Sequence, residues 1–397
     1  MATTLFSTLN RISPAHISNQ YTTAAKDVPA GAIVKGEKQG IKVYDDLDSL
    51  NEDYEAYTPT WKKARAYFAA NGEAASLAVL TFAPGTAQKA PAPANVKATP
   101  TTDGAKVTAD VVTAMADSDL SAEAIAAVTA LKKYYFAGPQ FWFLVEFDPD
   151  VALAISNFVE LQNTGLFLAY SNDATQLQAF TANKKTYPMT LPAVDDATAE
   201  VQDTYNNVFD AAFAGAMYGR RPHSAVKYAI GDLPYTKPQD RYDFTPDDLA
   251  ELEKYNIATY AYVLDTPRVT SSRMAADTFH LDTILGWDWI QNNITARSAN
   301  LFIQNAKQGI PYDEVGFDAI VNVIKGVFID AADMDIIAPL RDVNGNETGK
   351  PDYTVDYLKP GQLPKSYETK REMRGITTKY HPMGMVEDAY IENTIVM

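Results

Sequence analysis

The sequence contains four histidines, the residue type most often used near neutral pH for acid–base catalysis and for zinc binding. They are His16, His223, His280 and His381. No two of them lie at the His-Glu-x-x-His spacing that places two imidazoles on one helix face for a metal ion. A catalytic zinc site needs three protein ligands around one ion. The pattern therefore argues against a zinc hydrolase.

No phosphate-binding or nucleophile motif is complete. The segment 345–350 resembles a phosphate loop, but it has one residue too few between its glycines, and Pro351 replaces the hydroxyl residue that binds magnesium. A Gly-x-Ser-x-Gly elbow, which exposes a nucleophilic serine, is absent. Cysteine is absent too, which excludes disulfides, thiolate metal sites and thiol nucleophiles. We expect no cofactor, no metal and no enzymatic activity.

Acidic residues near position 340 imitate metal-binding loops. Asp342 begins a run like the first part of a calcium loop, but Glu347 stands where glycine is required and Tyr353 where a bidentate glutamate is required. A hairpin turn at Asn344-Gly345 explains this run better, because such a dipeptide tolerates the positive φ angles of a tight turn. A possible magnesium triplet precedes it, formed by Asp330, Asp333 and Asp335. Solvated acids at a helix end are the favoured interpretation of that triplet.

The overall charge limits the partners that the chain can bind. Fifty acidic residues against 34 lysines and arginines give a formal net charge of −16, which repels phosphate backbones and anionic lipid. No run of about 18 apolar residues occurs, as a membrane span requires. The first thirty residues lack the pattern of a signal peptide. We expect no nucleic-acid partner and no membrane insertion.

One stretch of this acidic chain is notably basic. Its members are Lys365, Lys370, Arg371, Arg374 and Lys379. Only Glu368 and Glu372 oppose them within the stretch. Two interpretations stay open, a solvated loop and a patch that docks an acidic partner.

Strands alternate with helices in the first half of the chain. Helices are expected at 45–70, 122–135, 151–161, 175–182 and 197–218, and strands at 77–82, 141–147, 165–170 and 186–191. Such alternation predicts an α/β layer in which part of the sheet is parallel, because crossover helices join successive strands. The segment 84–118, rich in Ala and Pro, cannot form a core and is interpreted as an insertion in this domain.

The second half begins with a clear helix start. Thr245 is followed by Pro246 and Asp248, which together cap and complement the free amides of a first helical turn. A strand at 257–263 follows, and then two long amphipathic helices, one with an apolar face from Trp287 to Leu301 and one from Phe317 to Phe328. A strand at 336–340 and the hairpin come next.

Both ends of the chain contain apolar residues without a surrounding core. The arm at 1–40 carries Leu5, Phe6 and Leu9, and a frayed terminus is its alternative interpretation. The segment 385–397 ends in strand-forming residues, namely Tyr390, Ile391, Thr394, Ile395 and Val396. A terminal strand needs a partner, which is either its own sheet or that of another subunit.

The second half resembles the contractile tail sheath proteins of phages. The resemblance lies in Lys307-Gln308-Gly309-Ile310-Pro311-Tyr312 after a long helix, in Arg371-x-x-Arg374, and in Gly384-Met385-Val386 before the final strand. It departs from the family pattern at Gly309, at Met385 and in the 84–118 insertion. The first half is similar more loosely.

The resemblance implies a multidomain α/β (α+β) fold with extended arms. It implies an outer α/β domain at 41–235, and an assembly domain at 236–397 that also takes its first strand from 1–40. The terminal segments would add strands to neighbouring subunits, and the basic stretch would dock the tube or a neighbour. The implied partners are further copies in six-fold rings, the tail tube protein, and baseplate and terminator proteins. The implied location is a virion tail assembled in the host bacterial cytoplasm.

Two other classes of function compete with a structural subunit. The first is a cytosolic α/β enzyme or small-ligand-binding protein, whose site would lie at the carboxyl ends of the parallel strands. The second is a monomeric binding module with a basic tail. The enzyme interpretation lacks a glycine-rich first turn and a catalytic triad. The binding module would require a tail that is dispensable for self-association.

Overall fold

The computed structural model describes residues 27–84, 120–135, 138–162, 164–194, 203–240, 243–276 and 279–387. The chain forms two compact units. The first unit comprises Met1–Gly219 and Ile230–Phe279, and the second comprises Arg220–Ala229 and His280–Met397. The division that we expected at 235/236 differs from this one, because residues 236–279 pack with the first unit.

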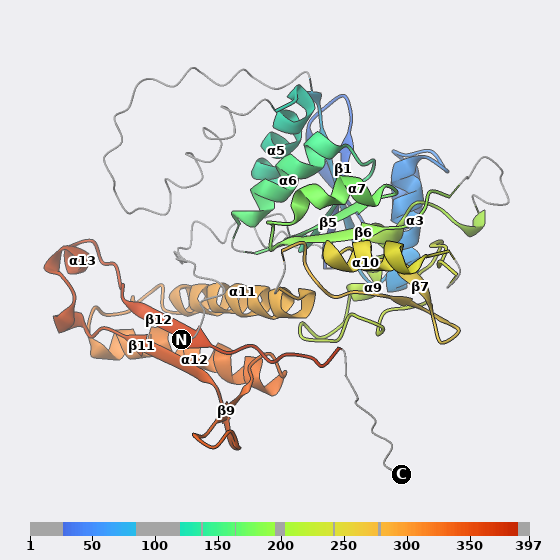
Figure 1. The fold of residues 1–397 in the computed structure, drawn as a ribbon. Helices are drawn as coiled ribbons and strands as arrows, with labels where there is room; N and C mark the ends of the chain where they lie inside the picture. Colours follow the sequence, from blue (N-terminus) through green and yellow to red (C-terminus); the bar gives the residue numbers. More distant parts are fainter. Residues whose placement is uncertain are drawn as a thin grey trace, which may run out of the picture. The chain divides into compact units, whose positions relative to one another are not determined.

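A six-stranded sheet forms the centre of the first unit (Figure 1). Its strands are β1 (Ala30–Lys35), β2 (Gly40–Tyr44), β3 (Leu77–Phe82), β4 (Phe141–Leu144), β5 (Leu166–Ser171) and β6 (Thr186–Thr190). Their order is β2-β3-β1-β4-β5-β6, and only β2 is antiparallel to its neighbour. The predicted α/β layer is confirmed. Strand β1 lies inside this sheet, so the assignment of a strand in 1–40 to the 236–397 domain is corrected.

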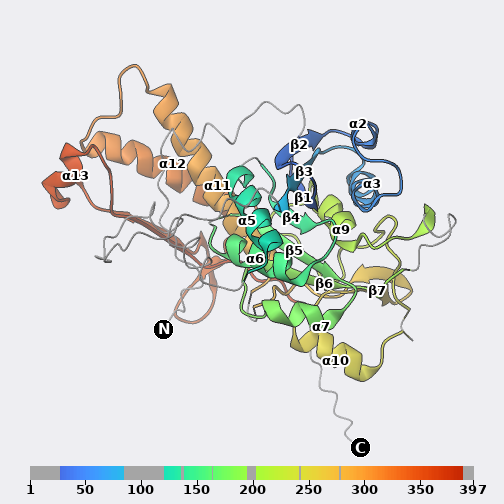
Figure 2. The same cartoon turned by 90° about the horizontal axis from the view of Figure 1, so that it is seen from above.

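Helices cover both faces of this sheet (Figure 2). On one face lie α5 (Ala122–Tyr134) and α6 (Pro149–Glu160), and on the other lie α3 (Pro59–Asn71) and α9 (Phe209–Met217). Smaller elements are α2 (Leu47–Asn51), α7 (Ala174–Leu177), η2 (Gln178–Phe180), α10 (Pro246–Lys254), β7 (Tyr260–Val263) and β8 (Thr266–Val269). The predicted cap of α10 is confirmed, because Thr245 and Asp248 form a capping box.

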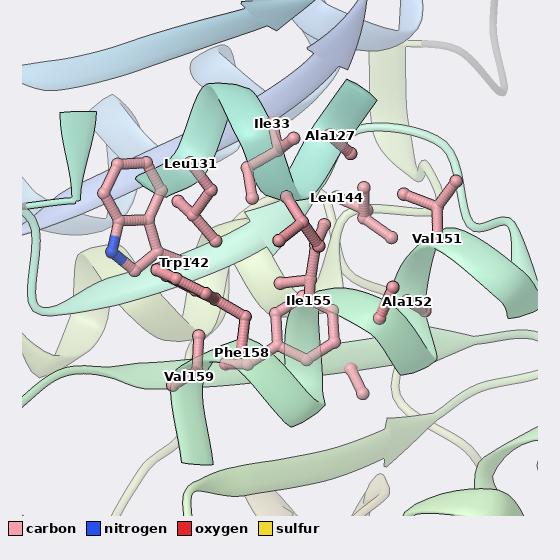
Figure 3. Packing of buried hydrophobic residues seen from close by; sticks show 14 of the residues in the cluster. Ile33, Ala127, Leu131, Trp142, Leu144, Val151, Ala152, Ile155, Phe158 and Val159 are labelled. Atoms are coloured by element: carbon pink, nitrogen blue, oxygen red, sulfur yellow. The ribbon is translucent and has the colours of Figure 1, made fainter. Parts of the chain in front are cut away.

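The core of the first unit lies between the sheet and the α5–α6 pair (Figure 3). Trp142 and Ile155 are completely buried there. A Cβ atom on Gly31 would lie 2.4 Å from the Trp142 ring, so only glycine lets strand β1 approach strand β4 here. The sheet is thus close-packed at its centre.

Two expected helices are shorter than predicted. The 45–70 segment is interrupted, because Asp46 caps α2 and Thr58 caps a new helix with Pro59 at its first position. Of the 197–218 helix, residues 195–202 lie outside the described residues, and α9 begins only at Phe209. Val208 at the cap of α9 has φ −132° and ψ 18°, which lie outside the helical region, so no continuous helix passes through it.

The second unit is built on two long helices, α11 (Leu281–Gln304) and α12 (Glu314–Asp333). They pack side by side, and Arg297 of α11 forms an ion pair of 2.5 Å with Asp330 of α12. Asp330 therefore has a structural role as the ion-pair partner of Arg297. The remaining elements are β9 (Pro339–Arg341), β10 (Glu347–Pro351), β11 (Tyr353–Tyr357), η3 (Pro360–Gln362), α13 (Lys365–Thr369) and β12 (Ile376–Tyr380).

The predicted hairpin at Asn344-Gly345 is confirmed. Strands β9 and β10 pair antiparallel around it, and Gly345 has a φ of 84°. Asp342 accepts hydrogen bonds from the amides of Asn344 and Asn346 at 2.8 and 2.9 Å, so its carboxylate closes a turn. Strands β11 and β12 were not predicted from the sequence.

Candidate inter-subunit interface

Strands β11 and β12 form a two-stranded antiparallel sheet. Tyr353 lies opposite Tyr380, and Tyr357 lies opposite Ile376. Among the residues that the structure describes, no third strand pairs with either one, so both outer edges of this sheet are open. An open edge presents backbone N–H and C=O groups and is a template for a strand from another chain.

The hydrogen-bond ladder decides which amides face these edges. The amide of His381 donates inward to the carbonyl of Asp352 at 3.1 Å. Inward and outward amides alternate along an antiparallel strand. The amides of Val355 in β11 and Thr378 in β12 therefore point to the open edges. Each edge offers donors and acceptors at the spacing that a further strand requires.

Aromatic packing holds the inner face of this sheet against the helices. The ring of Phe328 in α12 lies 5.2 Å from the Tyr353 ring and 5.9 Å from the Tyr380 ring. Trp287 of α11 stacks on Tyr380 at 6.4 Å. Burial raises the pKa of the Tyr380 phenol, which therefore stays neutral. The sheet is fixed on one face while its edges stay open.

The connection between the two strands is tied to α12. Lys359 pairs with Glu314 at 3.3 Å, and the hydroxyl of Tyr357 donates to Asp318. Tyr312, which lies in the Pro-Tyr turn used for the family resemblance, donates to the backbone of the connection at 3.3 Å. The Lys359–Glu314 and Tyr357–Asp318 contacts are exposed, so each contributes little to stability by itself, whereas the Tyr312 hydrogen bond is partly buried.

The predicted strand-adding residues lie outside the described residues. They are Leu5, Phe6, Leu9, Tyr390, Ile391, Thr394, Ile395 and Val396. The sequence analysis missed the acceptor sheet. A period-two pattern in Tyr353, Val355 and Tyr357, half-buried on one side, is the signal that could have identified it.

The predicted basic residues lie on the connection between β11 and β12 and on β12 itself. Lys365 is in α13, Lys370 is its cap, Arg371 follows with a φ of 54°, and Arg374 precedes β12. Lys379 lies in β12 opposite Thr354, and all five side chains are exposed. Arg374 donates twice to Glu372, at 3.1 and 2.9 Å. Its charge is therefore partly neutralised within the stretch.

The first unit has a pocket where the alternative enzyme interpretation requires one. A cavity of about 540 Å³ lies at the carboxyl ends of β4 and β5. Lys63 at its wall forms a buried ion pair of 2.6 Å with Asp210 and donates to the carbonyl of Leu144 at 2.6 Å. Burial raises the pKa of Asp210, and the Lys63 ammonium opposes this shift. The Lys63 ammonium thus makes its hydrogen bonds to the Asp210 carboxylate and to the Leu144 carbonyl.

The described part of the chain was compared with the requirements of a metal site and of a membrane-spanning helix, and meets neither. No group of three or more His, Cys, Asp or Glu side chains there is placed to hold a metal ion. None of the helices described is long and apolar enough to cross a membrane.

The chain is similar to known proteins in its fold rather than in its sequence. No family model matches the chain, and no curated protein matches it by sequence. The helical sheath of the anti-feeding prophage in its contracted state matches with a TM-score of 0.61 at 13% identity, covering 99% of both chains. The chain has a tail sheath fold. The sequence-based resemblance to sheath proteins is thus confirmed at the level of the fold.

Two further structures agree with this fold. A chain of the six-fold symmetrised baseplate of the anti-feeding prophage matches with a TM-score of 0.61 at 11% identity, covering 100% of both chains. The sheath tail protein of Listeria innocua matches with a TM-score of 0.51 at 10% identity, covering 93% of this chain and 98% of that one.

Proposed function

We propose that this chain is the structural subunit of a contractile tail sheath. It polymerises as stacked six-fold rings around a tail tube and contracts to drive the tube through a host envelope. The observation that carries this proposal is the match over 99% of both chains to the contracted helical sheath of the anti-feeding prophage. A match that extends over both units, and not over one common domain, supports this role for the whole chain.

The open-edged sheet supports self-assembly. Strands β11 and β12 are held on α12 by aromatic packing and leave two edges that suit strand addition. The terminal segments at 1–40 and 385–397 supply the added strands in this proposal. Addition of identical segments between copies in a head-to-tail manner gives rings or helices rather than closed dimers.

The remaining partners follow from the sheath role. The basic residues from Lys365 to Lys379 form a docking patch for the tube or a neighbouring subunit, since they are exposed on an acidic chain. Baseplate and terminator proteins bind the two ends of the sheath. The subunit assembles in the host bacterial cytoplasm and functions in the tail of the particle without catalysing a reaction.

A direct test is to express the full chain and examine it by negative-stain electron microscopy and sedimentation velocity. Rings or long tubes are expected from the wild type, whereas Ile391→Asp should sediment as a monomer because a charge enters the strand seam. Glu392→Gln changes a charge on the opposite face of the same proposed strand and should still assemble. A wild-type chain that stays monomeric at all concentrations would contradict the proposal.

A further inference from the structure

A buried histidine in the second unit has no hydrogen bond on either ring nitrogen. His223 belongs to Arg220–Ala229, the segment by which the chain leaves the first unit, joins the second and returns. The residue is 4% exposed, and neither Nδ1 nor Nε2 has a hydrogen-bond partner. Unpaired polar atoms in such a site are costly, and an imidazolium ion there is costlier still. The site therefore selects the neutral ring.

Two carboxylates face this imidazole from the helices. Asp282, the second residue of α11, places Oδ2 at 3.8 Å from Nδ1 of His223, beyond hydrogen-bonding distance. Asp335, which follows α12, also acts on His223 electrostatically. His280 and Glu387 act on Asp282 in turn. The two carboxylates attract a proton to the ring without forming a hydrogen bond that would fix it.

The other charged or titratable side chains of the segment are not buried, since Arg221 and Tyr228 are exposed and Arg220 and Lys227 are half-buried. Val226 is 1% exposed, and the guanidinium of Arg220 donates to the carbonyl of Ala225 within the segment at 3.1 Å. This hydrogen bond joins two residues of the segment to each other. His223 is therefore the titratable side chain that the segment buries in the second unit.

Burial and the two carboxylates shift the pKa of His223 in opposite directions, and burial has the larger effect. Burial lowers the pKa of His223 below its ordinary 6.5, and the attraction of Asp282 and Asp335 only partly offsets this. Above pH 6.5 the ring is neutral whether the segment is docked or released, so docking is independent of pH. Below 6.5 the released ring takes up a proton that the docked ring refuses, so docking weakens as pH falls towards the lowered value.

We propose that His223 is a protonation-sensitive lock that holds segment Arg220–Ala229 on the second unit at neutral pH and releases it in mild acid. The neutral ring fits a buried site beside the start of α11. Its protonation places a charge where no hydrogen bond awaits it. The result is a segment that is fixed to the second unit at neutral pH and loosened in acid.

Hydrogen–deuterium exchange of the full chain tests this lock. Exchange of peptides covering 220–229 is measured at about pH 7.5 and about pH 5.5, corrected for the intrinsic rates. The wild type should show up to about tenfold faster corrected exchange at the lower pH, the limit for one titrating group one unit below 6.5. His223→Gln, which cannot titrate, should exchange equally at both. His223→Leu suits the apolar site and carries the same expectation if the amide is not tolerated.

A matched control separates titration from loosening. Val226→Ala removes a buried, non-titrating side chain of the same segment, so it should raise exchange at both pH values and keep the wild-type ratio between them. Asp282→Asn removes an attraction that partly offsets burial, so it lowers the docked pKa of His223 further, and release in acid should be at least as large as in the wild type. The lock is wrong if His223→Gln keeps the acid-induced release, or if Asp282→Asn abolishes the release, because Asp282 would then be the group that titrates.

Discussion

The ring of Phe328 in α12 lies almost parallel to the ring of Tyr353 in β11, at 5.2 Å and with 28° between the ring planes. Phe328 is 1% exposed and also contacts Tyr380 of β12. One side chain therefore joins both strands of the open-edged sheet to the helix beneath them. The stability of the sheet and the integrity of the second unit should depend on it.

Truncation of this ring should be strongly destabilising. Phe328→Ala removes a buried aromatic side chain, and the expected loss in free energy of unfolding is about 3–5 kcal/mol. Ile329→Ala is the matched control, because the neighbouring Ile329 is 51% exposed and its loss should cost less than about 1 kcal/mol. Urea unfolding followed by circular dichroism measures both. Equal effects of the two changes would contradict the role assigned to Phe328.

The buried ion pair of the first unit gives a second prediction. Asp210→Asn leaves the Lys63 ammonium buried without a counter-charge, at an expected cost of about 3–5 kcal/mol. The double change Lys63→Met with Asp210→Leu removes both charges and should unfold closer to the wild type than the single change. Lys62→Met is the control, because Lys62 is the neighbouring lysine of α3 and is only half-buried, and its expected effect is below about 1 kcal/mol. A double variant no more stable than Asp210→Asn would show that the pair itself stabilises the unit.

The β7–β8 hairpin offers a stabilising change. Its two-residue turn consists of Leu264 and Asp265, which have φ angles of 49° and 64°, and Leu264 is 94% exposed. Asn-Gly is the preferred pair for such a turn. Replacing both residues by Asn and Gly should raise the free energy of unfolding by about 1 kcal/mol. Leu264→Val, which places a β-branched side chain at positive φ, should lower it. A thermal melt distinguishes these outcomes.

Elements with local signals could be predicted from the sequence. Thr245 with Pro246 defines the start of α10, and Asn344-Gly345 defines the hairpin, because caps and tight turns depend on a few adjacent residues. The order of parallel strands depends on packing between distant segments. Strand β1 therefore could not be assigned to its place between β3 and β4 from local pattern.

The candidate interface was predicted only in part. The basic residues are visible in the composition, but their docking role stays a prediction. Strands β11 and β12 pair across the intervening 358–375 segment and contain polar residues on their exposed face. Their pairing is set by the contacts of Tyr353 and Tyr380 with Phe328, which no short-range pattern reveals. The terminal segments 1–26 and 388–397, with the predicted strand donors, lie outside the described residues, so their pairing stays a prediction.

The last prediction concerns the two open edges. Thr378→Pro removes an outward amide of β12, and Val355→Pro removes an outward amide of β11, while the ladder between the strands keeps its hydrogen bonds. Each change should block assembly if a neighbour adds a strand at that edge, because the added strand loses a hydrogen bond and meets the proline ring. Negative-stain microscopy and sedimentation velocity report assembly, and far-UV circular dichroism reports the fold.

Two control variants separate loss of an edge amide from loss of a side chain and from damage to the sheet itself. Thr378→Val keeps the backbone amide and should assemble like the wild type, so side-chain loss at this position is separated from amide loss. Thr377→Pro removes an inward amide that bonds Asp356, so it should lower the melting temperature of the chain itself. If both outward proline variants form wild-type rings or tubes, neither edge accepts a strand, and the subunits must be joined by other surfaces.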